Sequence, residues 1–147
     1  LAGDGPARGE YEQLAERLGL GGRVRFLGWR NDRRALLEAC DICVRPRRYE
    51  PFGTVIAEAW AMRRPLVASL ADGARQYVRD GVNGLLCPIE DPPALAGCLR
   101  RAIGDAGLRA TLVAGGTAAY QADFTREVVV GRLLACYRRC IELGRRR

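Results

Sequence analysis

Short apolar runs alternate along this chain with longer stretches in which apolar residues recur at helical spacing. This alternation is typical of a parallel sheet with helices packed on it, because each parallel strand needs a long crossover connection to reach the next. The runs at residues 24–27, 42–44, 65–68 and 85–87 are the predicted strands. The sequence therefore predicts an α/β fold with a doubly wound, mostly parallel, Rossmann-like sheet that carries helices on both faces.

The amphipathic stretches are the predicted helices, and they include a helical C-terminal segment. They cover residues 8–18, 33–40, 53–62, 74–79, 94–103, 107–120 and 125–143. The length fits one domain, residues 1–147, in which 125–147 form a terminal helix and a basic tail. Because Leu1 reads as the end of a strand, we expect the domain to be N-terminally truncated.

Composition removes several classes of function. All 24 basic residues are arginine and histidine is absent, which excludes a histidine base, a histidine metal ligand and a Schiff-base lysine. The net charge of +7 is spread along the chain without a recognisable reading helix, so we expect no nucleic-acid partner. No signal peptide or spanning apolar run is visible. The expected location is the cytoplasm, which leaves open a peripheral position at the inner face of the membrane for the whole enzyme.

Six cysteines invite a zinc or disulfide interpretation, since Cys40 and Cys43 form a C-x-x-C pair and Cys136 and Cys140 lie one helical turn apart. Zinc knuckles hold such a pair in a tight turn, whereas Cys43 continues into a predicted strand. We therefore interpret the cysteines as free, small core residues and expect no metal site.

Ligands of doubly wound sheets bind outside the carboxyl ends of the strands, which nominates the loops at residues 3–6, 45–53 and 70–74. The second loop carries Glu50, and Glu58 lies about two turns into the helix that follows. Free amides at a helix start bind phosphate, so the amides of residues 53–55 are expected to meet a pyrophosphate. A carboxylate grips vicinal hydroxyls well, so one glutamate can meet a sugar and the other a ribose.

The spacing Glu50-x7-Glu58 within Glu-Pro-Phe-Gly-x4-Glu-Ala resembles the signature of the group 1 (E-x7-E) retaining glycosyltransferases. Segments at residues 3–6, 24–28, 65–68 and 80–86 also fall in that family's order, so the resemblance covers nearly the whole chain. It implies the C-terminal, donor-binding domain of an enzyme with the two-domain GT-B fold, whose first strand and acceptor domain would precede Leu1.

The resemblance also implies roles for individual residues. Glu50 is the implied catalytic residue, which contacts the transferred sugar, and Glu58 binds the ribose hydroxyls. The remaining implied donor-binding residues are Phe52 and Gly53 at the sugar, Thr54 and Val55 under the diphosphate, and Gly28, Trp29 and Arg30 at the base. Three positions depart from the family pattern: Arg47 replaces a serine, Arg64 a frequent glycine, and Gln76 a carboxylate.

The implied function is the binding of a nucleotide-diphosphate sugar for a retaining, hexosyltransferase-type reaction. The diphosphate would leave from the face that the acceptor attacks, through an oxocarbenium-like transition state that the protein stabilises by electrostatics. The acceptor, a polysaccharide, a lipopolysaccharide or another glycan or lipid-linked molecule, would be held by the missing N-terminal domain, so the fragment alone is expected to be inactive. No cofactor and no metal are expected, since the nucleotide sugar is a substrate.

Two alternatives stay open: a non-catalytic nucleotide-sugar-binding or scaffolding module, and a GT-B nucleotide-sugar epimerase. A dinucleotide-binding oxidoreductase fits poorly. The third glycine of its fingerprint would fall on Arg8, and no acidic residue ends the following predicted strand at Leu27.

Overall fold

The structure is a computed structural model that describes residues 1–145, so the last two arginines of the predicted basic tail lie outside the described residues. The chain forms two compact units, Leu1–Leu36 and Leu37–Arg147. Each unit is described by itself.

The first unit contains one helix, α1 (Arg8–Arg17), followed by an extended segment. The predicted strand at residues 24–27 is wrong as a strand, although the segment does pair with the first residues of the chain. The amide of Leu27 donates to the carbonyl of Leu1 at 2.9 Å, and that of Gly3 donates to Gly28 at 2.8 Å. The amide of Gly3 bonds to Gly28 and not to Leu27, which would continue the alternate-residue pattern of a parallel ladder, so the pairing does not become a regular strand.

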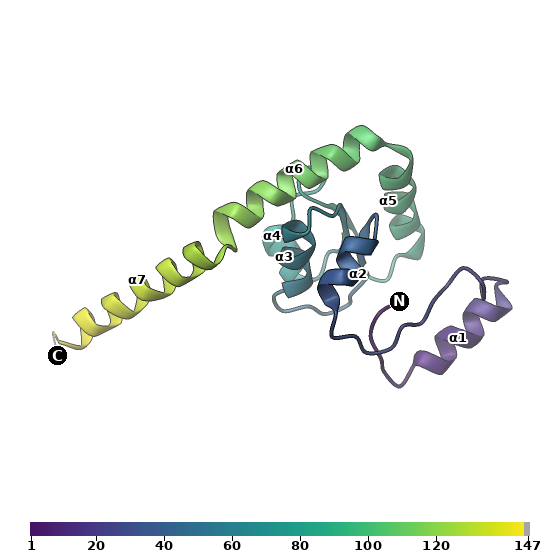
Figure 1. The fold of residues 1–147 in the computed structure, drawn as a ribbon, viewed down its shortest axis with the longest axis horizontal. Coiled ribbons are helices and arrows are strands. Elements are labelled where there is room, and N and C mark those ends of the chain that lie inside the picture. Colours follow the sequence, from purple (N-terminus) through teal and green to yellow (C-terminus); the bar gives the residue numbers. More distant parts are fainter. Residues whose placement is uncertain (146–147) are drawn as a thin grey trace. The chain divides into compact units, whose positions relative to one another are not determined.

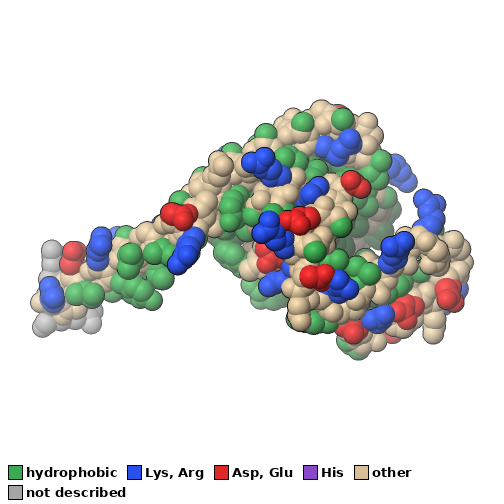
Figure 2. All heavy atoms as spheres, viewed as in Figure 1, with side chains coloured by type: hydrophobic (Ala, Val, Ile, Leu, Met, Phe, Trp, Pro, Cys, Tyr) green, Lys and Arg blue, Asp and Glu red, His purple; other side chains and the backbone are tan. Residues whose placement is uncertain are grey.

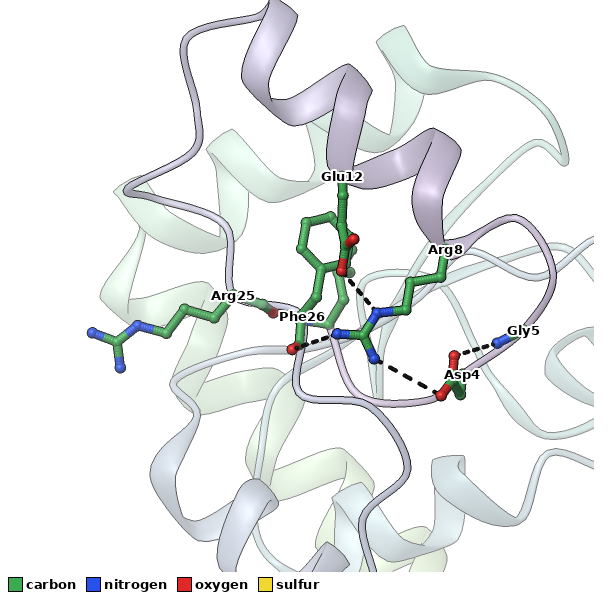
Figure 3. Close-up of polar contacts among 7 residues, drawn as sticks. Asp4, Gly5, Arg8, Glu12, Arg25 and Phe26 are labelled. Carbon is green, nitrogen blue, oxygen red and sulfur yellow. Dashed lines mark hydrogen bonds and ion pairs between the residues drawn. The ribbon is translucent and has the colours of Figure 1, made fainter.

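Arg8 ties α1 to this paired segment (Figure 3). Its Nε donates to Glu12 on the next helical turn at 2.7 Å, and its Nη2 reaches the carbonyl of Phe26 at 3.4 Å. Asp4 lies 3.8 Å from the same guanidinium. These contacts raise the pKa of Arg8, chiefly through the hydrogen bond to Glu12. A single arginine thus links the first loop, α1 and the extended segment.

The second unit is built on a three-stranded parallel sheet with the order β1 (Cys43–Arg45), β2 (Leu66–Ser69), β3 (Leu85–Cys87). Cys43 pairs with Leu66, and Val67 pairs with Leu85. The three later predicted strands are therefore confirmed to within one residue, and the parallel direction is confirmed with them. All three strands end at the same edge, as parallel strands with this register must.

Six further helices follow within residues 1–145, and their bounds agree with the predicted ones to within three residues. They are α2 (Arg33–Ala39), which crosses the boundary between the units, α3 (Thr54–Ala61), α4 (Asp72–Tyr77), α5 (Pro92–Gly104), α6 (Ala106–Asp123) and α7 (Arg126–Gly144) (Figure 1). Asp91 and Asp105 cap α5 and α6 by accepting hydrogen bonds from backbone amides in the first turn.

Helices cover both faces of the sheet, as predicted. On one face, Leu66 and Ala68 of β2 pack with Ile56, Ala59 and Trp60 of α3. On the other face, Val67 belongs to a second cluster, with Leu85 and Cys87 of β3, Cys98 and Ala102 of α5, and Leu112 of α6. Alternate residues of one strand therefore enter different cores, which is why β2 is buried along its whole length and apolar in sequence.

Trp60 connects α3 to α6 and to the turn before β3. Its indole Nε1 donates to the carbonyl of Asn83 at 2.8 Å in the buried interior. A Cβ atom placed on Gly116 of α6 would lie 2.3 Å from the indole ring, so glycine there allows the two helices to approach. The backbone of α6 therefore lies against the aromatic ring that anchors α3.

The helix α7 has no buried residue, and its apolar side chains are exposed (Figure 2). The prediction that the cysteines are core residues is confirmed for Cys43, Cys87 and Cys98 but wrong for Cys136 and Cys140, which lie exposed on α7. Periodicity identified the helix, but it carries no information on whether another element covers that face. Within residues 1–145, no helix combines the length and the apolar character that crossing a membrane requires.

Candidate functional site

The loops that follow β1 and β2 meet at the carboxyl edge of the sheet. The amide of Gly73, in the first turn of α4, donates to the carbonyl of Glu50 at 2.7 Å. The hydroxyl of Ser69, the last residue of β2, donates to the carbonyl of Arg47 and, at 3.4 Å, to that of Arg45. Two of the three nominated loops, residues 45–53 and 70–74, therefore lie together, whereas residues 3–6 belong to the other unit.

Glu50 is held by an arginine that sequence reasoning did not select. Nη2 of Arg45, the last residue of β1, lies 2.9 Å from Oε2 of Glu50, and both side chains keep only about a quarter of their surface exposed. Nε of Arg47 lies 4.0 Å from the same oxygen. Among the described residues, the other carboxylate oxygen, Oε1, has no hydrogen-bond or ion-pair partner. The arrangement can offer one carboxylate oxygen to a ligand while the other is fixed.

The start of α3 has the geometry expected of a helix that opens on a glycine. Gly53 is the N-cap residue and adopts a left-handed conformation with φ of 80°, which disfavours any residue with a Cβ atom. A Cβ atom there would also lie 2.7 Å from Cδ1 of Ile56. No side chain caps the helix, and Thr54 at its first position is exposed. Gly53 is therefore required by its own backbone and by packing, whatever binds nearby.

Phe52 and Val55 contribute to packing. The ring of Phe52 lies 5.4 Å from that of Tyr77 and 6.2 Å from that of Phe124, centre to centre, in edge-to-face arrangements, yet 46% of the residue stays exposed. Val55 is partly buried against the same core. The aromatic contacts fix the loop in front of α3, so that any contact of Phe52 with a ligand would come from its backbone or its exposed ring edge.

Glu58 lies on α3, half-buried, and is engaged in polar or charged interactions within the protein. Burial, followed by the adjacent Cys40, raises the pKa of Cys43 to about 11, and the charge of Glu58 adds to this shift. The carboxylate of Glu58 therefore lies close enough to β1 to influence a buried thiol. The predicted contact of Glu58 with a ribose stays a prediction.

The three residues predicted to meet the base, Gly28, Trp29 and Arg30, lie in the first unit. Gly28 has a left-handed backbone with φ of 64°, and Trp29 is 78% exposed. Arg30 forms an ion pair with Asp32, and its hydrogen bond lowers the pKa of that carboxyl group. An exposed indole beside a left-handed turn offers a flat surface for stacking.

Sequence reasoning overlooked the loop after β3. Together with the loop after β1, it lines a hollow of about 380 Å³ whose walls include Arg47, Ser69, Cys87, Asp91 and Leu95. Nε of Arg48 and Oε1 of Glu90 form an ion pair of 2.8 Å between these two loops. The sequence could have nominated this loop, because a third parallel strand must end at the same edge of the sheet as the other two.

One departure from the family pattern lies beside a left-handed residue at the end of α3. Arg64 was expected to replace a glycine, but the left-handed conformation that favours glycine falls on Arg63, with φ of 54°. The amide of Arg63 donates to Trp60 and that of Arg64 donates to Ala59, the hydrogen-bond pattern that ends many helices with a left-handed residue.

Comparison with known proteins identifies the family. The profile described as glycosyl transferases group 1 matches residues 1–105, which is well over half of the chain. The chain belongs to the group 1 glycosyltransferases. Its three parallel strands with surrounding helices form half of a GT-B fold, as the resemblance implied.

Individual relatives and solved structures are similar to this chain over most of its length. The lipopolysaccharide core biosynthesis glycosyltransferase LpsE of Rhizobium meliloti is 38% identical over 134 residues, 91% of this chain and 39% of LpsE. The Anabaena protein Alr3699/HepE, crystallised with UDP, superposes with a TM-score of 0.87 at 34% identity, over 93% of this chain and 39% of HepE. Sucrose-phosphate synthase of Thermosynechococcus elongatus gives a TM-score of 0.86 at 32% identity, over 97% and 38%.

This group 1 glycosyltransferase chain thus spans about two-fifths of the length of these relatives. HepE has also been crystallised with UDP-glucose, in a structure that superposes with a TM-score of 0.81 at 38% identity, over 88% of this chain and 37% of HepE.

Proposed function

We propose that this chain is the donor-binding half of a retaining glycosyltransferase that transfers a hexosyl group from a nucleotide-diphosphate sugar. The observation that carries the proposal is the carboxyl edge of the sheet, where Arg45 holds Glu50 beside the uncapped start of α3. The family supports it, and so do the complexes of HepE with UDP and UDP-glucose.

In this proposal, each part of the edge has a task. Amides of Gly53, Thr54 and Val55 hold the diphosphate, whose charge the positive end of α3 stabilises as it leaves. Glu50 accepts a hydrogen bond from a hydroxyl of the transferred sugar, and Glu58 accepts hydrogen bonds from the ribose hydroxyls. Gly28, Trp29 and Arg30, which belong to the first unit and not to this edge, receive the base. No metal and no cofactor take part.

The acceptor and the setting belong to the whole enzyme. We propose a glycan or lipid-linked acceptor, bound by an N-terminal domain, as the relation to a lipopolysaccharide core glycosyltransferase suggests. A lipid-linked acceptor would place the enzyme at the inner face of a membrane as a peripheral protein.

Calorimetric titration of the chain with UDP and with UDP-glucose tests the donor site. Binding of both ligands is expected, and Glu58→Gln should weaken both about tenfold, since it removes a charged acceptor from the ribose. The matched control is Glu142→Gln on α7, whose side chain is exposed and should leave both affinities unchanged. No binding of either ligand by the folded chain would refute a UDP-sugar donor site, and titration with GDP-sugars would then test the other base.

Retention is tested on the whole enzyme. NMR of the product should show the anomeric configuration of the donor, and Glu50→Ala should abolish transfer in a protein that still folds. Inversion would exclude the proposed reaction. Donor binding by a wild-type enzyme that transfers to none of a panel of glycan and lipid-linked acceptors would favour the non-catalytic module.

A further inference from the structure

Arg45 occupies a position from which it can set the orientation of Glu50. As the last residue of β1, it pairs with Ala68 of β2, and its carbonyl accepts a hydrogen bond from Ser69. The base of its side chain is therefore fixed to the central strand of the sheet. The guanidinium then bridges five residues along the chain to Oε2 of Glu50, at 2.9 Å.

The backbone of Glu50 is fixed independently, since its carbonyl accepts the hydrogen bond from Gly73 at 2.7 Å. With the backbone held by α4, the remaining freedom of Glu50 is rotation of its side chain. The hydrogen bond from Arg45 restricts that rotation and engages one of the two carboxylate oxygens, and Nε of Arg47 lies 4.0 Å from the same atom. The pair is three-quarters shielded from solvent, so that salt screens it less than a surface pair.

We propose that Arg45 is a positioning residue that holds Glu50 by Oε2 and thereby presents Oε1 to a single hydroxyl of the donor sugar. The inference rests on the proposed function. Arg45 acts through Glu50 and makes no contact with the nucleotide. Its loss therefore weakens the binding of the sugar nucleotide and leaves the binding of the nucleotide diphosphate unchanged.

The ratio of the dissociation constants for UDP-glucose and UDP isolates this effect. With Arg45→Gln, the affinity for UDP-glucose should fall about tenfold, as expected for loss of one well-oriented charged hydrogen bond, while that for UDP changes less than about twofold. Glu50→Gln should change the ratio to a similar extent. The double variant should lose no more than the larger single loss, because both changes remove one contact.

Arg45→Lys keeps the charge but not the forked geometry, so it should restore part of the ratio. The control is Arg132→Gln, which breaks an arginine–carboxylate pair with Asp123 away from the sheet edge and should leave the ratio unchanged. Thermal unfolding of each variant, monitored by circular dichroism, sets a titration temperature at which all are folded. A merely structural loss would lower the affinities for both ligands together.

Three outcomes decide the matter. If Arg45→Gln leaves the ratio unchanged while Glu50→Gln alters it, Arg45 does not position Glu50, and the donor site itself stands. If neither variant alters the ratio, Glu50 offers no sugar contact for Arg45 to hold, and the inference is overturned. If the wild-type chain binds neither UDP nor UDP-glucose, the UDP-sugar donor site fails first and the inference fails with it.

Discussion

The amide of Gly73 donates its hydrogen to the carbonyl of Glu50, so that the first turn of α4 carries the loop that precedes α3. A Cβ atom on Gly73 would lie 2.6 Å from the carbonyl of Phe52 and 2.9 Å from that of Glu50. These are backbone atoms, which cannot move without moving the loop. The position of Glu50, in the loop before α3, therefore depends on a glycine in α4.

Gly73→Ala should displace this loop. We expect the chain to lose about 1–3 kcal/mol of stability through overpacking, and to bind UDP-glucose at least about tenfold more weakly. Urea unfolding and calorimetric titration measure the two effects. Gly81→Ala offers a comparison, since it introduces strain at a left-handed glycine in the turn before β3 but has open space around it. An unchanged affinity in Gly73→Ala would show that the loop adapts.

The two helical glycines Gly116 and Gly97 should respond in opposite directions to alanine. Gly116→Ala would bring a methyl group to 2.3 Å from the ring of Trp60, so we expect a loss of about 1–3 kcal/mol despite the better helix propensity of alanine. Gly97, within α5, has nothing within 4 Å of the added atom. Gly97→Ala should therefore gain about 0.5–1 kcal/mol in urea unfolding. Equal signs for the two variants would contradict the close contact between α6 and Trp60.

Arg63→Gly should stabilise the chain by about 0.5–1 kcal/mol. Glycine removes the roughly 1–2 kcal/mol that the left-handed conformation costs an arginine, and its larger loss of chain entropy on folding offsets only part of that gain. Arg63→Ala keeps the Cβ atom and hence the strain, and should bring no gain. Chemical denaturation of the two variants beside the wild type measures the difference. If Arg63→Ala also stabilises the chain, the gain comes from removing the rest of the arginine side chain and not from relieving left-handed strain.

Stability should decline in alkaline solution through Cys43. Its pKa is raised from 9.0 to about 11 in the folded chain, mainly by burial, so the folded state binds this proton more tightly than the unfolded state does. The stabilisation is present below pH 9 and is lost as the pH rises towards 11. Denaturant midpoints measured at pH values from about 8 to about 11, where thiols titrate, give the slope of stability against pH. Cys43→Ala should reduce the slope without abolishing it, because burial also raises the pKa values of Cys40, Cys87 and Cys98, and an unchanged slope would assign the effect to other groups.

The elements that the sequence predicted best are those in which local pattern and tertiary packing agree. Leu85–Cys87 was placed without error, because its apolar run is bounded by turn residues and is buried. The segment at residues 24–27 has the same local pattern, but strand formation depends on a partner that the sequence does not reveal. Periodicity likewise located α7 but could not show whether another element packs on it.

The candidate site was predictable as far as its motif reached. The motif nominated Glu50 and the glycine that opens α3, and the structure places both at the carboxyl edge of the sheet. Arg45 escaped notice because an arginine at the end of a strand has no signature. Its significance arises from the bend of the loop, which returns Glu50 to a residue five positions earlier. Such a contact depends on the conformation of the loop, which the spacing of residues in the sequence does not predict.

The alternation along β2 has a consequence for how accurately the edge of the sheet can be built. Leu66 and Val67 fill different cores, so sliding the strand by one position would place a side chain of the wrong size in both layers simultaneously. Two independent packing errors thus oppose any slip. The position from which the Ser69 hydroxyl bonds to the carbonyls of Arg45 and Arg47 is consequently set by the packing of the protein interior. Evolution could therefore vary the loop residues that follow each strand without changing how the strands align.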